Sequence, residues 1–188
     1  KPFVEDLAVG ERLCDLAEGL GLRLAVNQNG RWAPHFAYLR AAVGAGLLGT
    51  VTSGDFSVHW DHDREVASSR FAAMPDLILH DFGIHWFDIV ADVFRDAGPA
   101  RRVYASVGRD PGQSIAAPAQ AQVLIDYERA QVSLVFRGAC GIDEEGRYRV
   151  TGTQGAVTSA GPAPAANVAR FSAREGSVDV PLAGHWFR

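Results

Sequence analysis

The second half of the chain, between residues 103 and 180, is made of short segments in which apolar and polar residues alternate. Alternation with a period of two is typical of strands that bury one face and expose the other. Many such strands predict an α+β fold, with a largely antiparallel open sheet that helices cover on one face. The predicted strands are residues 103–107, 123–127, 132–136, 148–150, 156–158 and 177–180, with turns at 128–131 and 152–155.

The first half of the chain shows helical spacing instead. Leucines recur along residues 5–21, and apolar residues recur along residues 31–49, where Pro34 suits the first turn of a helix. Two strands are also predicted here, a short apolar one over residues 23–26 and a second one that starts at Thr50 and alternates over residues 56–60. A helix followed by a glycine connection and a short strand is the closing half of an α/β unit.

Residues 76–94 predict a helix that carries several ionisable side chains suited to acid–base catalysis. Side chains step by about 100° around a helix, so one polar stripe and one apolar face are expected. Asp81 lies four residues before His85, a spacing at which a carboxylate can orient an imidazole and shift its proton affinity. The same pattern fits an ordinary amphipathic helix whose histidine faces solvent, and both interpretations stay open. The stripe contains Asp81, His85, Asp88 and Asp92, and the apolar face contains Phe82, Trp86, Ile89, Val90 and Val93.

Composition excludes several classes of function. Lys and Arg number 18 against 22 Asp and Glu, for a net charge of −4, so no nucleic-acid partner is expected. No apolar run approaches the ~20 residues of a membrane span, so no membrane partner is expected. Cys14 and Cys140 lack metal-ligand spacing and are expected to be free, buried thiols in a reducing cytoplasm. The chain starts at Lys1 without Met and stops at Arg188, and both ends are expected to be truncated.

Two dense polar groups are candidate pocket residues. Residues 27–30 read Asn-Gln-Asn-Gly beyond the predicted strand of residues 23–26, where α/β sheets bind ligands, although a simple turn fits them too. Residues 59–63 read His-Trp-Asp-His-Asp. His59 and His62 would point to opposite faces of a regular strand, so we expect no metal site. Trp32 and Trp60 are candidates for stacking on a sugar ring, although buried core tryptophans are the commoner case.

Several segments together resemble the Gfo/Idh/MocA family of nicotinamide-dependent oxidoreductases. Lys1-Pro2 resembles the end of that family's Glu-Lys-Pro signature, and residues 26–32 resemble the residues that follow its Rossmann domain. Leu47-Leu48-Gly49 resembles the element before the first sheet strand. Residues 81–88 are similar to the family's Asp-x-Gly-x-His-x-x-Asp helix motif, and residues 152–155 to its Gly-Thr-x-Gly turn.

The resemblance implies a domain organisation and a set of roles. Residues 1–30 would be the last α/β unit of a Rossmann domain, and residues 31–188 a truncated C-terminal substrate-binding and oligomerisation domain. The implied catalytic residues are Lys1, Asp81 and His85; the cofactor-binding residues are Lys1, Pro2 and Asn27; the substrate-binding residues are Asn29, Arg31, Trp32, Trp60, His62 and Asp88. Lys1 would hydrogen-bond the reacting oxygen, Asp81 would orient His85 or the substrate, and His85 would be the general acid or base.

Cofactor and partners are implied in the same way. NAD or NADP would be bound by the longer parent protein and not by this fragment. The expected substrate is a sugar, a polyol or a related small molecule, and the expected assembly is a homo-oligomer, a dimer or tetramer formed through the open sheet face. Two alternatives remain: a non-catalytic oligomerisation or binding module, and a metal-dependent hydrolase built on the His and Asp groups.

Overall fold

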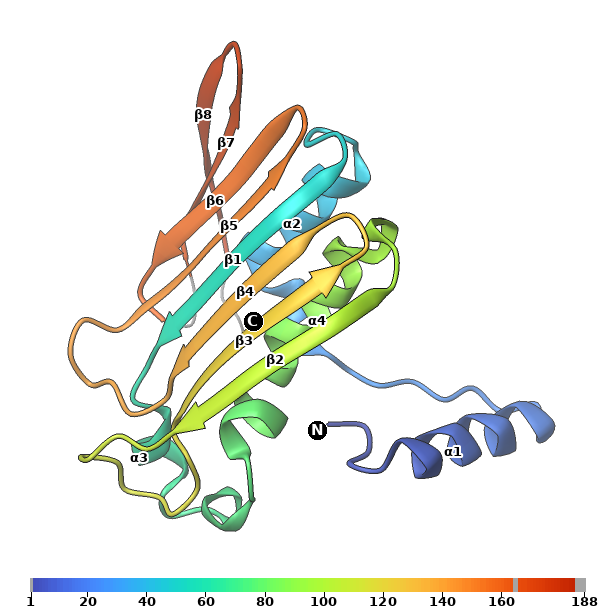
Figure 1. Cartoon of the computed structure of the whole chain (residues 1–188), viewed down its shortest axis with the longest axis vertical. Helices are drawn as coiled ribbons and strands as arrows, with labels where there is room; N and C mark the ends of the chain where they lie inside the picture. The colour runs from blue at the N-terminus through green and yellow to red at the C-terminus, as the bar shows by residue number, and fades with distance from the viewer. Residues whose placement is uncertain (1, 164–165, 185–188) are drawn as a thin grey trace.

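One open eight-stranded sheet organises the chain, and helices cover one of its faces (Figure 1). The computed structural model describes residues 2–163 and 166–184. The strands lie in the order β2-β3-β4-β1-β5-β6-β7-β8, and β1 and β4 are parallel while the other neighbours are antiparallel. The strands are β1 (Val51–His59), β2 (Ala100–Gly108), β3 (Gln120–Tyr127), β4 (Gln131–Arg137), β5 (Glu145–Gly152), β6 (Gly155–Gly161), β7 (Val168–Ala173) and β8 (Gly176–Pro181).

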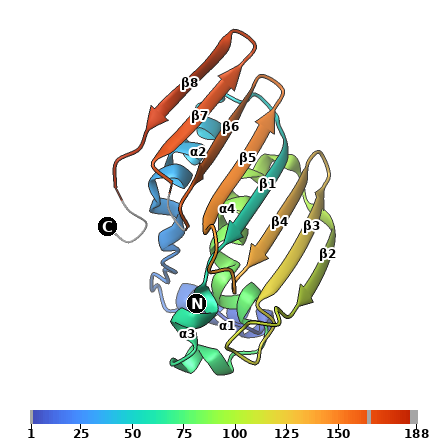
Figure 2. The ribbon, with the colours of Figure 1, turned by 90° about the vertical axis from the view of Figure 1, so that its left-hand side faces the viewer.

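Short helices connect and cover these strands (Figure 2). The α-helices are α1 (Leu7–Gly19), α2 (Pro34–Gly44), α3 (His62–Val66) and α4 (Ile84–Val93). The tighter or wider turns are η1 (Asn29–Trp32), η2 (Arg70–Ala73) and η4 (Arg95–Ala97), which are 3₁₀-helical, and η3 (Ile78–Phe82), which is π-helical. None of the helices in the described part of the chain is long and apolar enough to cross a bilayer.

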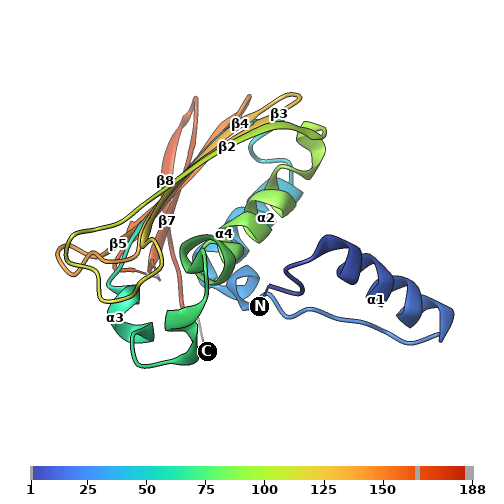
Figure 3. The same ribbon diagram turned by 60° about the horizontal axis from the view of Figure 1, so that its bottom comes forward.

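The alternation along each strand decides which face is buried. Phe56 and Val58 of β1 are almost fully buried beneath the helices, whereas Asp55 and Ser57 point to the opposite face. That opposite face carries no helix, as Figure 3 shows most clearly. The largest fully buried side chains in the core include Phe36, Leu39, Phe56, Ile89, Leu134 and Phe136, drawn from α2, α4 and the central strands. The prediction of an α+β fold with a largely antiparallel open sheet is confirmed.

The predicted strand over residues 23–26 is wrong, because this segment is extended but joins no sheet. A strand needs a neighbour for its backbone hydrogen bonds, and no described strand lies beside it. Leu22, Leu24 and Val26 keep 64%, 48% and 45% of their surface exposed. Helix α1, predicted over residues 5–21, is confirmed, and it stands away from the sheet and its covering helices (Figure 3). Its leucines are exposed as well.

The two long helices predicted around the core are both interrupted. The helix predicted for residues 31–49 is the turn η1 followed by α2, and it ends where Gly46 and Gly49 adopt left-handed backbone angles. The helix predicted for residues 76–94 begins as the π-helical turn η3, in which Gly83 N–H donates to the Ile78 carbonyl, five residues back. The α-helical pattern starts again after Gly83. Period counting over one long stretch missed this break, because a π turn inserts a residue without changing composition.

β7 and the longer reach of β6 were also missed. The loop predicted at residues 160–166 starts inside β6, and residues 164–165 lie outside the described residues. β7 carries only a short alternating pattern, and its pairing with β6 and β8 is what makes it a strand. The loop predicted at residues 65–75 contains the end of α3 and the turn η2. The expectation of buried thiols is also wrong, because Cys14 is exposed on α1 and Cys140 is only half-buried.

Candidate active site at the start of helix α4

Asp81 and His85 lie where the π-helical turn η3 meets the first turn of α4. Their exposed fractions are 7% and 8%, so both polar side chains are buried in this domain. The interpretation of an amphipathic helix whose histidine faces solvent is therefore wrong. Gly83 between them is buried as well, and a Cβ atom there would sit 3.0 Å from the carbonyl oxygens of Ile78 and Leu79. Glycine thus allows the backbone to pack tightly at the point that presents both residues.

His62 approaches this pair from α3. Its Nε2 atom lies 3.9 Å from Oδ2 of Asp81, and both side chains are mostly buried. The His62 ring contacts Trp60 and Phe82, with ring centroids 5.2 Å and 4.9 Å away. The structure therefore brings together three of the predicted site residues, Trp60, His62 and Asp81, from two separate elements. An imidazole this close to a carboxylate can exchange a proton with it or hold it in one orientation.

Two arginine–aspartate pairs fix the rest of the polar stripe. Arg31 in η1 donates to both carboxylate oxygens of Asp88, at 2.6 Å and 2.7 Å. Arg40 in α2 pairs with Asp92. The hydrogen bond to Asp88 raises the pKa of Arg31, with burial opposing it. For Asp92, burial alone would raise the pKa, but the Arg40 hydrogen bond and the nearby guanidinium charges hold it below its usual value.

The remaining predicted site residues are placed less closely. Trp32 is 71% exposed and lies beneath the Arg40 guanidinium, 5.7 Å from the ring centroid. Asn29 is half-buried in η1, and Asn27 is exposed in the extended segment before it. Pro2 is half-buried, and no described contact joins it to Asp81 or His85. Lys1 lies outside the described residues.

The sequence interpretation missed a buried histidine, and it missed the approach of Glu65 and Glu144 to the predicted pocket residue Asp61. His35 of α2 is 5% exposed, and burial lowers its pKa to about 4. Asp61 and Glu65 lie near Glu144. The pKa of both carboxyl groups is raised, mainly by burial and to a smaller extent by neighbouring carboxylates. Pro34 marked the start of a helix but gave no sign of which side would be buried. The approach of Glu144 depends on the loop before β5, which no local pattern indicates.

Metal ligation finds no support in residues 2–163 and 166–184, where no group of three or more His, Cys, Asp or Glu residues is arranged to hold an ion. His59 and His62 lie on different sides of the sheet, but not as opposite faces of one strand, because β1 ends at His59 and His62 begins α3. His59 ends β1 on the helix-free face of the sheet, whereas His62 lies against Asp81.

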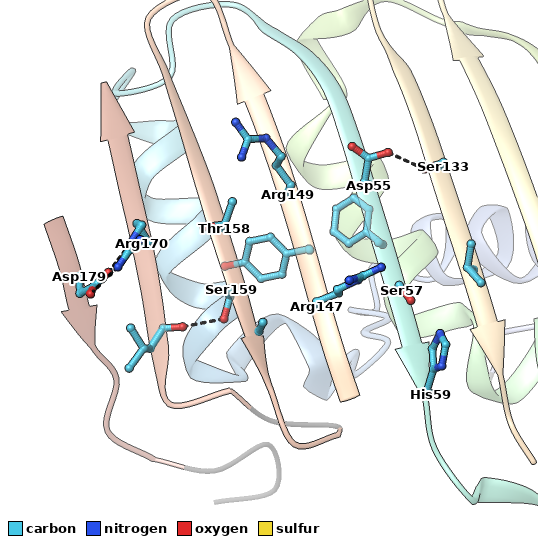
Figure 4. A pocket seen from close by; sticks show the side chains of 15 residues that line it. Asp55, Ser57, His59, Ser133, Arg147, Arg149, Thr158, Ser159, Arg170 and Asp179 are labelled. Carbon is cyan, nitrogen blue, oxygen red and sulfur yellow. Dashed lines mark hydrogen bonds and ion pairs between the residues drawn. The ribbon is translucent and has the colours of Figure 1, made fainter. Parts of the chain in front are cut away.

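The helix-free face carries the larger hollow (Figure 4). It measures about 840 Å³ and lies over the central strands. Arg149 is opposite Asp55 in the register of β1 and β5, but Asp55 instead accepts a hydrogen bond from Ser133 at 2.7 Å. Arg170 is paired with Asp179 at 2.6 Å. This concave surface carries charged and polar side chains among apolar ones, and it lies across the sheet from Asp81 and His85.

A comparison with protein families decides the class of the chain. Residues 36–158 match the GFO/IDH/MocA C-terminal domain. The chain belongs to this family. The match runs from the first turn of α2 into β6 and includes β1 to β5, α4 and the Asp81–His85 segment.

Individual relatives agree with this assignment. The chain is similar to a D-apiose dehydrogenase from Paraburkholderia graminis, with 30% identity over 135 residues, which is 72% of this chain and 35% of the relative. Among solved structures it resembles an oxidoreductase from Agrobacterium radiobacter in complex with NAD+, L-tartaric acid and magnesium, with a TM-score of 0.81 at 21% identity. That match covers 96% of this chain and 52% of the other.

A second solved structure supports the same fold. An inositol dehydrogenase homologue from Azotobacter vinelandii, complexed with NADH and myo-inositol, matches with a TM-score of 0.78 at 18% identity, over 97% of this chain and 50% of that one. At these identities the structural likeness concerns the fold alone. The chain spans about a third of the length of the curated relative and about half the length of the two solved structures.

Proposed function

We propose that this chain is the C-terminal catalytic and substrate domain of an NAD(P)-dependent oxidoreductase. The parent enzyme interconverts a hydroxyl and a carbonyl group on a sugar, a polyol or a related small molecule, in the cytoplasm. Family membership supports the class of enzyme, and the names of the relatives support the class of substrate. The single observation that carries the proposal is the burial of Asp81 and His85 where η3 meets α4, with His62 3.9 Å from Asp81.

This meeting point can handle the proton of the reaction. Oxidation of an alcohol needs a base within hydrogen-bond reach of the O–H group and a donor for the oxygen. His85 accepts the hydroxyl proton, Asp81 orients the imidazole or the substrate, and Lys1 donates to the reacting oxygen. Low exposure favours this chemistry, because electrostatic interactions strengthen where water is scarce. Trp60 and His62 form the adjoining wall against which a sugar ring can lie.

Arg31 and Asp88, which the family resemblance implies are substrate-binding residues, have a structural role in this proposal. Each occupies the other with two hydrogen bonds, so both serve chiefly to hold η1 against α4. Asn29 and Trp32, in the same turn, then border the substrate side.

Nicotinamide supplies hydride transfer in enzymes of this class. The described residues do not form a cradle for the whole dinucleotide: within residues 2–163 and 166–184 no glycine-rich turn leads from a strand into a helix. We therefore assign Lys1, Pro2 and Asn27 only to the nicotinamide end of the cofactor.

Residues 1–30 fit the remnant of a cofactor domain. Leu7, Leu16 and Leu20 are 75%, 58% and 62% exposed on α1, and the extended segment after it has no strand neighbour. Both features are expected of a helix and strand taken from a larger sheet. In the full-length parent, backbone amides of residues 23–26 should exchange with deuterium far more slowly than in this chain. Equal exchange rates in the two would contradict the domain assignment.

The test of the activity uses the full-length parent with NAD or NADP and a panel of sugars and polyols. Absorbance at the nicotinamide band should change with at least one substrate, and His85→Ala should abolish that change. Asp179→Ala, which alters an exposed pair at the far edge of the sheet, is the matched control and should keep activity. A folded parent that reduces neither cofactor with any substrate would overturn the proposal.

Assembly through the helix-free face is a second proposed role. A concave sheet surface covered on one side only commonly becomes an interface, and Arg149 makes no ion pair with any described carboxylate. We infer a dimer or tetramer in which this face meets a second copy. Light scattering should then report an oligomer for the wild-type chain. Arg149→Glu should shift it toward monomer, and Arg174→Glu, in an exposed turn outside this hollow, should not.

The two roles separate cleanly by variant. A parent in which His85→Ala loses activity but keeps its oligomer supports catalysis. A parent in which the same variant changes only the oligomer supports a non-catalytic assembly module.

A further inference from the structure

A second, smaller hollow lies where the parallel pair of strands ends. It measures about 430 Å³ and is bordered by residues from β1, β3 and β4 and by the loop that follows β4. His59 and Arg137 end their strands side by side in the β1–β4 register. Gln120 is opposite Arg137 in the β3–β4 register. Three hydrogen-bonding side chains from three neighbouring strands therefore line one hollow.

The walls of this hollow are fixed by backbone hydrogen bonds. Trp60 N–H donates to the Arg137 carbonyl at 2.9 Å, and Cys140 N–H donates to the Trp60 carbonyl at 3.3 Å. On the other side, Gln113 Nε2 donates to the carbonyls of Ile115 and Ala117 and thereby braces the loop between β2 and β3. Because these hydrogen bonds already hold the walls in place, the walls lose little conformational entropy when a ligand binds.

The guanidinium of Arg137 makes no ion pair within the described part of this hollow. Arg137 is half-buried, and no ion pair joins its guanidinium to a carboxylate among residues 2–163 and 166–184. Among the described residues that border the hollow, Asp110 is the one carboxylate. It keeps its negative charge, but both of its oxygens accept from neutral donors and not from Arg137. Its Oδ1 accepts from Gly112 N–H at 2.9 Å, and its Oδ2 accepts from Gln120 Nε2 at 3.1 Å. Most other arginines of the sheet have a carboxylate partner, as Arg102 does with Asp126 at 2.8 Å.

We propose that this hollow is a binding site for the oxyanion group of a small molecule, a carboxylate or a phosphate. The planar fork of Arg137 matches two oxygens of such a group, and His59 lies beside it to donate a further hydrogen bond. The site is separate from the Asp81–His85 site, because His59 and Arg137 face the helix-free side of the sheet. It does not depend on the dehydrogenase activity, but it shares its face of the sheet with the proposed contact between copies, since His59 borders both hollows. A bound anion and a second copy seated over this hollow would therefore compete.

The test is calorimetric titration of the purified chain with sodium phosphate, sodium acetate and glycerol at constant ionic strength. Saturable binding of phosphate or acetate in the millimolar range or tighter is expected. The anion that binds more tightly shows whether the natural ligand carries a phosphate or a carboxylate. Glycerol should not bind. Arg137→Gln should weaken binding by about tenfold or more, whereas Arg174→Gln, the same change of charge in an exposed turn, should leave it unchanged.

A second measurement covers the case in which Arg137→Gln does not fold. Amide resonances of the wild-type chain, followed during the phosphate titration, should move around residues 59, 120 and 137–142. Shifts spread evenly over the surface arginines, no saturable binding of either anion, or equal weakening by Arg174→Gln would each overturn the proposal.

Discussion

Arg31 and Asp88 join the turn η1 to helix α4 through two parallel hydrogen bonds of 2.6 Å and 2.7 Å. The two residues are 57 positions apart in sequence, so this contact sets how the segment after α1 meets the helix that carries His85. Asp88 is the more buried partner, with 13% of its side chain exposed against 41% for Arg31. Removing the arginine leaves the buried carboxylate without its main partner.

Arg31→Ala should therefore lower the free energy of unfolding by about 1–2 kcal/mol, since a buried charged acceptor loses two charge-assisted bonds. Urea unfolding followed by circular dichroism measures this. Arg102→Ala removes a pair whose side chains are 82% and 30% exposed and should cost less than about 0.5 kcal/mol. Equal losses in the two variants would show that the Arg31–Asp88 contact is only a surface pair.

His35 gives the stability a defined dependence on pH. Burial lowers its pKa in the folded chain to about 4 from the ordinary histidine value of 6.5, so the unfolded chain binds the proton more readily. The stabilisation is complete above pH 6.5 and is lost as pH falls toward 4, with a maximum loss of about 3 kcal/mol. Asp92, whose pKa is lowered from 3.8, loses its contribution only at lower pH.

Urea midpoints measured from pH 7.5 to 4.5 test this dependence. The wild-type midpoint should fall steeply between pH 6.5 and pH 4.5, and His35→Gln should flatten that slope even if it lowers stability at neutral pH. His59→Gln removes a histidine at the open face and should leave the slope intact. A His35→Gln variant with the wild-type slope would show that other groups cause the dependence.

The alternating strands were readable from sequence because each depends on one property, a period of two. Phe56 and Val58 are buried and Asp55 and Ser57 are not, as that period requires. The segment of residues 23–26 shows where this fails, since strand formation depends on a neighbour that local composition does not reveal. The segment has the right residues and no partner among the described strands.

The candidate site was predictable in part for a similar reason. The four-residue spacing of Asp81 and His85 placed both near one end of α4. The spacing did not reveal that η1 and α2 would pack over the polar stripe, because the partners Arg31 and Arg40 lie 57 and 52 residues from Asp88 and Asp92. His62 was proposed as a pocket residue. Its approach to Asp81 depends on the short helix α3, which no pattern predicted and which runs into the loop expected from residue 65.

The backbone of residues 48–50 packs closely against Gly152, the last residue of β5, and a substitution at Gly152 tests this contact. A Cβ atom at this position would clash with the Leu48 carbonyl oxygen and lie 2.8 Å from that of Thr50. Both obstacles are backbone, which cannot move aside as a side chain can. Gly152→Ala should therefore cost about 2–4 kcal/mol of unfolding free energy or prevent folding.

The matched control is Gly44→Ala, at the end of α2. Nothing lies within 4 Å of a Cβ atom there, and alanine favours a helix, so this variant should be neutral or up to about 1 kcal/mol more stable. Thermal unfolding of the two variants side by side gives the comparison. A Gly152→Ala chain as stable as the wild type would mean that Leu48 and Thr50 are less rigidly placed than the sheet implies.

Asp81 is expected to act as a positioning residue for the proton-handling histidine. Asp81→Asn keeps the size of the side chain but removes the negative charge that faces His62 at 3.9 Å. In the full-length parent this variant should lower kcat by about 10²-fold or more, since contributions of general acid–base groups are of this order. KM should change less, and the pH profile of kcat should shift, because the charge that influences the neighbouring imidazoles is gone.

Asp92→Asn removes a charge from helix α4, one turn beyond Asp88, and should lower stability while leaving the pH profile of kcat in place. A parallel loss of stability and activity in Asp81→Asn, with an unchanged profile, would indicate that Asp81 only supports the packing of η3 against α3.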